Sequence, residues 1–367
     1  MMTRRQFSAC APGLASSAAM LQACTPGPAT PSYEQAVRDT WRHGAVASGD
    51  AAALRLELVR YATLAPSSHN TQCWRLGIDE RAVTIAPDLT RRCPAVDPDD
   101  HHLFVSLGCA AENLAQAALA NGLKAEVAFD AGRDLLRIAL ETTAASASPL
   151  YQAIPQRQST RGEYDGKPLA ADELRQLERA AAGAGVRLLL LTERPMLEKV
   201  LDFVVQGNTA QIDDPAFVQE LKSWIRFSTA DAVQRGDGLY SASSGNPTLP
   251  TWLGPRLFDF VFTAKAENDK YAKHIRSSAG IAVFVGPRDD KASWIEVGRA
   301  CERFTLQATA LGVRTAHLNQ PVEVRSLRPL FASMLGVPDQ RPDLVIRFGR
   351  GPTLPPSLRR PVAAVLV

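Results

Sequence analysis

The spacing of apolar and polar positions predicts a chain that mixes helices and strands without strict βαβ alternation. Some segments repeat apolar residues every three to four positions, as amphipathic helices do, whereas others alternate or form short apolar runs typical of strands. Helices are expected near 51–64, 171–182, 194–211, 215–230 and 256–275, and in two longer segments described below. Strands are expected in a hairpin at 74–86 and near 124–129, 135–141, 186–192, 281–286 and 344–348. This mixture favours an α+β fold whose sheets are covered by helices.

An internal repeat gives the chain its organisation. Residues 99–125 align without gaps onto 289–315, with eight identities in 27 positions. Each copy reads as a long helix that follows Asp residues and ends at a Gly. Small residues at Gly108 and Gly298 would let the two helices approach closely. The alternative is a chance likeness between two alanine-rich helices.

The repeat predicts two similar halves, 35–148 and 149–367, joined by a small-residue stretch. Ligands often bind between two such units, because their interface supplies a cleft that neither has alone. We therefore expect a pseudo-dimer within one chain, with a binding site at the seam.

Charge and hydropathy exclude several classes of protein. The formal net charge is +3, and residues 1–23 contribute two arginines and no acidic residue, so the remainder carries +1. A nearly neutral chain is not typical of nucleic-acid binders. We find no run of about 18 purely apolar residues, and therefore expect no transmembrane helix.

The N-terminal segment reads as an export signal. Arg4 and Arg5 precede a small, weakly apolar stretch that ends before Cys24, and a Pro-rich linker covers 24–34. Residues 1–23 resemble a twin-arginine signal peptide with a lipoprotein cleavage box, so a mature protein would be periplasmic or membrane-anchored through a lipid on Cys24. The twin-arginine route carries folded proteins, which suits a chain that loads a cofactor before export. The alternative is an uncleaved tail that happens to contain two arginines.

The cysteines and histidines give no sign of a metal site. Four cysteines lie beyond the leader region without a CxxC pair, and we expect Cys109 and Cys301 to be buried free thiols. His101 and His102 are adjacent and would diverge on a helix, so we expect no bound metal.

Two polar motifs carry the chemistry. Residues 65–74, APSSHNTQCW, follow a predicted helix and place hydroxyl and amide groups on a turn begun by Pro66. Residues 157–161, RQSTR, place two arginines around a serine, a pattern that suits a phosphate. Taken alone, the first motif is more often a cap and the second a solvated loop.

Together with the repeat, these motifs resemble the FMN-dependent nitroreductase superfamily, over roughly residues 50–362. The likeness is strongest to its Acg-like branch, in which one chain carries two nitroreductase-like halves around a long helical core. The resemblance implies that the turn contacts the flavin and ribityl, that Arg157 and Ser159 meet phosphate and ribityl, and that Arg161 faces the pyrimidine edge. It further implies that a backbone amide of the 319–323 loop lies near flavin N5 and that a basic C-terminal segment closes on the phosphate. The FMN-binding residues expected are Pro66, Ser67, Ser68, Asn70, Gln72, Arg157, Ser159, Arg161, Gln320, Pro321, Val322, Arg359 and Arg360.

The sequence departs from the family in ways that affect these expectations. The first half has no second Arg-x-Ser-x-Arg segment, so one FMN per chain is expected. Cys73 stands where the family usually has Pro. The Gly/Ser/Pro-rich loop 236–255 reads equally as a lid over the flavin or as a surface excursion.

The resemblance implies an FMN oxidoreductase with ping-pong kinetics. Hydride would pass through the flavin to a small nitroaromatic or quinone-like acceptor, with NAD(P)H or a periplasmic donor as the reductant. No acid–base residue stands out, and solvent could supply protons. The alternatives are a flavoprotein that stores or sequesters FMN, and a cofactor-free interaction lipoprotein.

Overall fold

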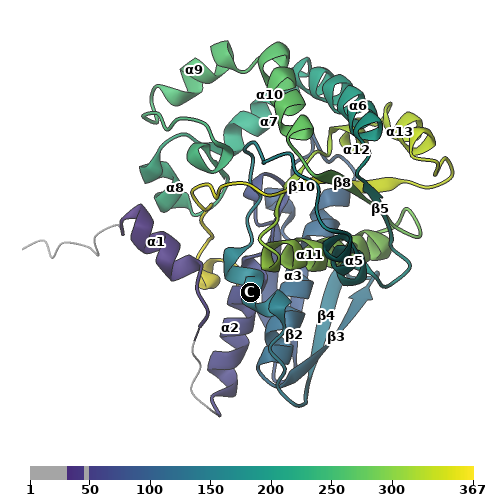
Figure 1. The fold of residues 1–367 in the computed structure, drawn as a ribbon. Helices are drawn as coiled ribbons and strands as arrows, with labels where there is room; N and C mark the ends of the chain where they lie inside the picture. The colour runs from purple at the N-terminus through teal and green to yellow at the C-terminus, as the bar shows by residue number, and fades with distance from the viewer. Residues whose placement is uncertain (1–30, 45–48) are drawn as a thin grey trace, which may run out of the picture. The chain divides into compact units, whose positions relative to one another are not determined.

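The computed structural model describes residues 31–44 and 49–367 (Figure 1). The predicted leader 1–23 and Cys24 lie outside the described residues. The boundary expected at 148/149 stays a prediction, although the two main sheets fall on either side of it.

The first sheet is antiparallel and is built from the first half of the chain. Its strands are ordered β1-β2-β4-β3. They span Trp74–Ile78 (β1), Ala82–Pro87 (β2), Leu123–Asp130 (β3) and Leu135–Thr142 (β4). Alternate residues of β3 are exposed, as expected for a sheet with one face toward solvent. The C-terminal tail joins this sheet, because Leu76 N–H donates to the Val365 carbonyl and Val367 N–H to that of Leu76.

The second sheet is also antiparallel, in the order β5-β8-β10-β9. Its strands span Arg187–Leu191 (β5), Gly280–Val285 (β8), Arg314–His317 (β9) and Pro342–Gly349 (β10). Every residue of β8 and β10 is buried. Along β8, Ala282 and Phe284 join the main core, whereas Ile281 and Val283 join a second core with α6 and α10. Both faces of this sheet are therefore covered, which explains its continuous apolar runs.

The two repeat segments form the central pair of helices, α3 (His101–Ala120) and α11 (Lys291–Ala310). A Cβ placed on Gly108 would collide with the Ile295 carbonyl, and one on Gly298 with the Val105 carbonyl. Gly108 and Gly298 are equivalent in the repeat, as are Val105 and Ile295, so the contact is reciprocal. The close approach predicted from small residues is confirmed, and the crossing has approximate two-fold character.

The remaining helices surround these layers. They span Tyr33–Thr40 (α1), Ala51–Thr63 (α2), Pro149–Ala153 (α4), Ala171–Ala181 (α5), Arg194–Ile212 (α6), Pro215–Trp224 (α7), Thr229–Arg235 (α8), Gly254–Val261 (α9), Ala264–Arg276 (α10), Gln320–Glu323 (α12) and Arg328–Met334 (α13). Short 3-10 turns cover Ser68–Asn70, Leu89–Arg91, Ile154–Gln156, Ser241–Ser244 and Val362–Ala364, and a two-residue parallel pair joins Ile225–Arg226 to Leu239–Tyr240.

Two predicted helices are each divided in the structure. The segment 215–230 forms α7 and α8, because Ser228 begins a new helix by accepting from Asp231 N–H at 3.1 Å. The segment 256–275 forms α9 and α10, with Thr263 capping α10 through Ala266 N–H at 3.3 Å. Local capping therefore interrupts apolar patterns that read as continuous.

One helix, α3, is long and apolar enough to cross a membrane by length and composition, a test that a buried core helix also passes. In the structure, 78% of its apolar window is buried inside the protein, against α11 and the first sheet. Here α3 is the central core helix.

Candidate functional site

The turn after α2 has a strained backbone. His69, Asn70 and Gln72 all have positive φ, at 49°, 53° and 54°. Non-glycine residues rarely adopt this conformation, and such residues cluster at binding sites. Ser67 stabilises the turn by accepting the Gln72 N–H through its hydroxyl at 2.9 Å.

Two adjoining cavities open beside this turn. One, of about 270 Å³, is lined by His69, His102, His274 and His317 among others, and we call it the histidine cavity. The other, of about 400 Å³, is lined by Arg157, Arg161, Arg314 and Arg359, and we call it the arginine cavity. Pro66, Ser67, Arg161 and Leu239 line both. Segments from both halves of the chain therefore meet at one continuous site.

The arginine cavity carries excess positive charge. None of the described residues that line it is acidic. Behind it, the buried Glu302 carboxylate lies 3.3 Å from Arg157 Nε. Burial and the neighbouring Arg157 charge lower the pKa of Arg359 to about 9. Binding of an anion would reduce the electrostatic repulsion among these arginines.

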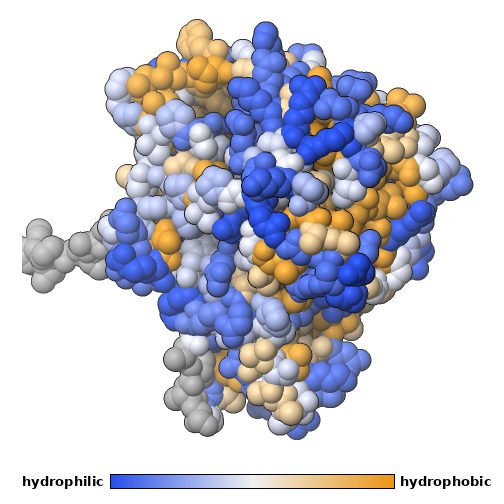
Figure 2. All heavy atoms as spheres, viewed as in Figure 1, coloured by the Kyte–Doolittle hydropathy of each residue, from blue (hydrophilic) through white to orange (hydrophobic). Residues whose placement is uncertain are grey.

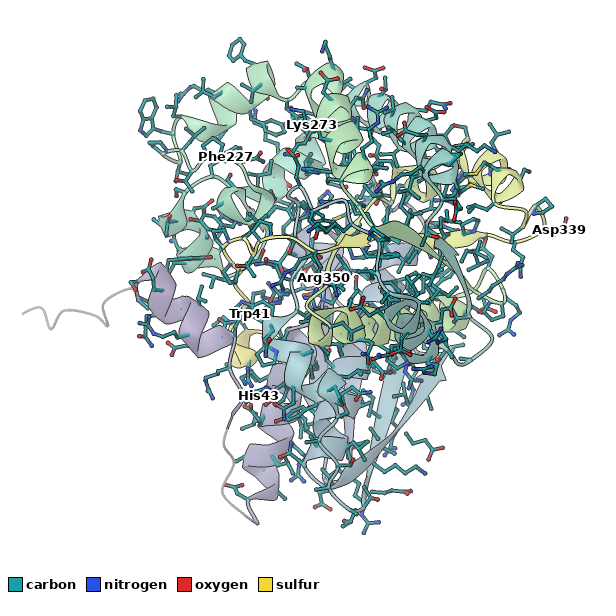
Figure 3. All side chains as sticks on the ribbon, in the orientation of Figure 1. Trp41, His43, Phe227, Lys273, Asp339 and Arg350 are labelled. Atoms are coloured by element: carbon teal, nitrogen blue, oxygen red, sulfur yellow. The ribbon has the colours of Figure 1, made fainter. Side chains whose placement is uncertain are left out.

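Arg359 is held firmly in this wall. Its guanidinium donates to the carbonyls of Thr63, Leu64 and Ala65 at the end of α2, where the helix dipole favours a cation. It also lies 4.8 Å from the ring centroid of Trp41, a residue labelled in Figure 3.

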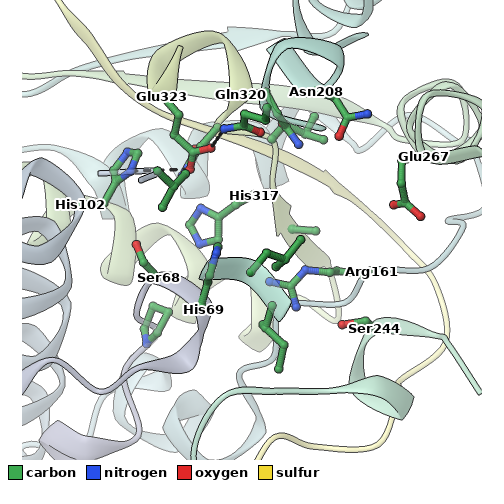
Figure 4. Close-up of a pocket in the computed structure, with 18 of the residues that line it drawn as sticks. Ser68, His69, His102, Arg161, Asn208, Ser244, Glu267, His317, Gln320 and Glu323 are labelled. Atoms are coloured by element: carbon green, nitrogen blue, oxygen red, sulfur yellow. Dashed lines mark hydrogen bonds and ion pairs between the residues drawn. The ribbon is translucent and has the colours of Figure 1, made fainter. Parts of the chain in front are cut away.

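The histidine cavity is lined by groups whose ionisation is shifted by burial (Figure 4). Burial lowers the pKa of His69 to about 4 and that of His317 to about 3. It also raises the pKa of Tyr271 to about 12. Arg161 lies between the two cavities, and burial lowers its pKa as well.

Unpartnered polar atoms concentrate around the two cavities. Five cavity-lining side chains have a buried atom without a hydrogen-bond partner: His69 Nε2, Asn70 Oδ1, Ser243 Oγ, His317 Nδ1 and Gln320 Oε1. Buried polar groups usually have partners, so such a concentration indicates that a polar ligand completes the site. Together with the arginines, these donors and acceptors fit a molecule that carries a phosphate, hydroxyls and a polar ring, as FMN does.

The structure brings most of the predicted residues together. The cavities are lined by Pro66, Ser67, Ser68, Asn70, Arg157, Ser159, Arg161, Gln320 and Arg359. Gln72, Pro321, Val322 and Arg360 are not among the lining residues. Gln72 is buried beneath the turn, where it donates to the Gly236 carbonyl and accepts from Arg360 N–H, each at 2.8 Å. Gln72 and the Arg360 backbone therefore stabilise the turn from beneath and do not line either cavity.

The expected backbone donor at 321–323 is not free. Residues 320–323 form the single turn α12, in which Val322 and Glu323 N–H both donate to the Asn319 carbonyl, at 2.9 and 2.8 Å. Pro321 has no N–H. Helix formation therefore engages the Val322 and Glu323 amides, and the side chains of Gln320 and Glu323 line the cavity.

Several lining residues were missed by sequence reasoning. His317 ends β9, Tyr271 lies on α10, and His102 is on α3. Among the four histidines that line the histidine cavity, only His69 stood inside one of the two polar motifs. His317 lies two residues before the predicted flavin loop 319–323, which is the one signal that could have indicated it.

The 236–255 loop combines both expected roles. Its first part, including Leu239, Ser243 and Ser244, forms cavity wall, whereas Trp252 is 68% exposed. The following helix α9 likewise turns Phe258 toward the cavity and leaves Phe260 exposed. Figure 2 shows apolar surface at the upper left, where Figure 1 places α9. Only the beginning of the loop covers the site.

Asp97, His101 and His102 form a tight buried cluster, with potential ligand atoms within 4.8 Å of one another. The two histidine rings do not diverge as predicted, since their centroids lie 4.6 Å apart. Asp97 uses both carboxylate oxygens to accept N–H groups of His102 and Leu103. Asp97 thus caps the start of α3.

The four described cysteines are free and buried, which confirms the prediction for Cys109 and Cys301. Both lie where α3 and α11 meet, and both line the histidine cavity.

Two antiparallel sheets around a paired-helix core, with an arginine-rich cavity at their seam, define an α+β protein of the nitroreductase type. The family model "Nitroreductase family" matches residues 154–350, a little over half of the chain. The chain therefore belongs to the nitroreductase family.

Relatives match a larger part of the chain. "Putative NAD(P)H nitroreductase Rv3131" of Mycobacterium tuberculosis is 26% identical over 319 residues, covering 83% of this chain and 88% of that protein. "Putative NAD(P)H nitroreductase acg" of the same species is 24% identical over 321 residues, covering 84% and 93%.

Solved structures resemble the chain more distantly. A Bacteroides fragilis nitroreductase with bound FMN is 16% identical, with a TM-score of 0.35, covering 56% of this chain and 89% of that one. The FMN-dependent nitroreductase NfnB from Mycobacterium smegmatis, in complex with NADPH, is 15% identical, with a TM-score of 0.37, covering 55% and 87%.

Proposed function

We propose that the chain binds one FMN across the two cavities and transfers reducing equivalents from NAD(P)H to a small nitroaromatic or quinone-like acceptor. One observation carries this proposal: the arginine cavity, which has no acidic residue among the described residues that line it, adjoins the histidine cavity, and both share Ser67 and Arg161 as lining residues. Unpartnered polar atoms line the two cavities. Family membership and the names of the relatives support it.

The chain's own residues have separate tasks in this scheme. Arg157 and Arg359 would bind the phosphate, and Glu302 holds Arg157 in place from behind. Arg161 would place a fixed cation at the edge of the ring system, which favours the reduced, anionic form of a flavin. When bound, the flavin supplies the hydride chemistry, and the protein positions it and sets its electronics.

The repeat supports a pseudo-dimer origin for this site. The turn at 66–70 belongs to the first half and Arg157–Arg161 to the second, and both line the arginine cavity. The counterpart of Glu302 in the repeat, Glu112, is engaged by Arg299 and Arg303, at 3.2 and 3.0 Å. Glu112 thus pairs with arginines of α11, whereas Glu302 pairs with Arg157 of the cavity wall, and the first half has no second Arg-x-Ser-x-Arg segment, in keeping with one FMN per chain.

The test begins with the purified full chain. We expect a yellow protein whose extracted chromophore is FMN, bleaching with NAD(P)H and recolouring with a nitroaromatic or a quinone. Asn70→Ala should alter the flavin spectrum, because Asn70 comes from the other half and lines the same cavity. A colourless protein that takes up no FMN would contradict the proposal. Bound FMN that NAD(P)H does not bleach would favour the storage function instead.

We also propose that residues 1–23 direct export by the twin-arginine route and that a lipid on Cys24 anchors the protein. The support is the sequence pattern alone. Replacing Arg4 and Arg5 by lysine should retain the protein in the cytoplasmic fraction, whereas Cys24→Ser should release it from the membrane fraction. Unchanged fractionation of both variants would overturn this assignment.

A further inference from the structure

The histidine cavity contains one contact between two titratable side chains that the proposed flavin chemistry does not use. His102 Nδ1 lies 3.7 Å from Glu323 Oε1, and both residues line the cavity (Figure 4). His102 is at the start of α3 and Glu323 at the end of α12, so the contact joins the two halves.

The other hydrogen-bond partners of His102 and Glu323 determine which atoms of the two side chains carry a hydrogen. His102 Nε2 lies 3.1 Å from the backbone carbonyl of Asp343, which can only accept, so Nε2 carries a hydrogen. Gln211 Nε2 donates to Glu323 Oε2 at 2.6 Å. The atoms left facing each other are His102 Nδ1 and Glu323 Oε1.

Without a further proton, a lone pair on Nδ1 would face a buried carboxylate oxygen. That arrangement is repulsive, and burial raises the pKa of Glu323. A single proton between the two atoms, on either one, removes the repulsion. The pair is therefore placed to hold one proton at the cavity wall.

The other histidines of the cavity do not store a proton in this way. Burial lowers the pKa of His69 to about 4, and those of His274 and His317 to about 3. All three are neutral at pH 7.

We propose that the His102–Glu323 pair is the proton donor for the acceptor that the flavin reduces, which rests on the proposed function. Reduction of a quinone to a hydroquinone takes two electrons and two protons, as does reduction of a nitro group to nitroso and water. The hydride brings both electrons and one proton, and the pair gives the second proton to an acceptor oxygen. The pair then takes a proton back from solvent.

Other charged groups face the pair and shape its pH dependence. Asp97 raises the pKa of Glu323, and Arg328 from α13 opposes this. The His101 ring lies beside that of His102, tilted by 34°, and burial holds the pKa of His101 well below its usual range.

The decisive variant is Glu323→Gln, which keeps the shape and removes the ionisable group. Its control is Glu126→Gln, on the exposed face of β3. Flavin reduction by NADPH is measured separately from reoxidation by benzoquinone and by ferricyanide, which accepts electrons without protons. We expect reoxidation by benzoquinone to slow at least tenfold in Glu323→Gln and to lose its pH dependence near neutrality. Reoxidation by ferricyanide and the control variant should be unchanged.

A second measurement does not depend on turnover. Nitrogen NMR of the His102 ring and the carboxyl infrared band of Glu323, in the wild-type chain at neutral pH, should locate one proton on the pair. A neutral imidazole beside an ionised carboxylate would overturn the proposal, as would equal slowing with both acceptors. Absence of bound flavin would instead refute the proposed function, leaving the NMR result to decide the proton's place.

Discussion

Gly108 and Gly298 lie at equivalent positions of the two central helices, and each lies directly against the backbone of the other helix. The site at the seam depends on this contact, because α3 carries His102 and α11 carries Glu302, which fixes Arg157.

Gly108→Ala should therefore destabilise the protein, although alanine favours a helix by about 1 kcal/mol over glycine. The added methyl group collides with the Ile295 carbonyl, and backbone cannot yield as a flexible side chain does. We expect a loss of about 1–3 kcal/mol in the free energy of unfolding, measured by denaturant titration. Gly132→Ala, in an exposed turn with room for a methyl group, is the control. A Gly108→Ala protein as stable as the wild type would refute the close contact.

Arg157→Ala should weaken FMN binding by removing a charge-assisted partner of the phosphate, at a cost of about 1.5–3 kcal/mol. It should also destabilise the fold, because Glu302 is left buried and unpaired.

A double variant separates the two effects. Arg157→Ala with Glu302→Gln should recover much of the unfolding free energy and none of the FMN affinity. Calorimetric titration with FMN and thermal unfolding of the flavin-free proteins measure both. Recovery of FMN affinity in the double variant would show that Arg157 does not bind the phosphate.

Gln72→Ala should lower stability while leaving FMN affinity nearly unchanged. Its amide satisfies the Gly236 carbonyl and the Arg360 N–H, and each group left buried without a partner costs about 1–3 kcal/mol. Thermal unfolding and FMN titration are compared with those of Gln206→Ala, at an exposed position of α6. A large loss of FMN affinity in a Gln72→Ala protein of normal stability would show that Gln72 contacts the flavin.

Asp343 should make stability fall as pH rises toward neutrality. Burial raises its pKa from 3.8 to about 7. Between these values the folded state holds a proton that the unfolded state has released, so the free energy of unfolding decreases with rising pH. The full shift corresponds to about 4 kcal/mol.

The Asp343→Asn variant isolates this contribution, since other buried carboxyls also titrate. Denaturant titrations at about pH 5 and about pH 8 should show a shallower decline for the variant than for the wild type. Parallel pH profiles would mean that Asp343 is ionised in the folded protein.

The sequence alone determined most of the elements and much of the site's wall. Apolar periodicity located every strand of the two main sheets except β9, although it joined α7 to α8 and α9 to α10, and the matched small residues of 99–125 and 289–315 predicted the close helix pair. The turn at Pro66–Asn70 and the Arg157–Arg161 segment were identified because their unusual polar patterns are local.

Only the tertiary structure decided which groups face the cavity. Pro321–Glu323 reads as an open loop, but one helical turn consumes its amides, while Gln72 is drawn inward by two backbone partners from distant segments. His102 and Glu323 are 221 positions apart in the chain, and no local pattern relates them. Side-chain pairing across such a separation is set by how the helices pack, since packing fixes which polar groups lose water and must find one another.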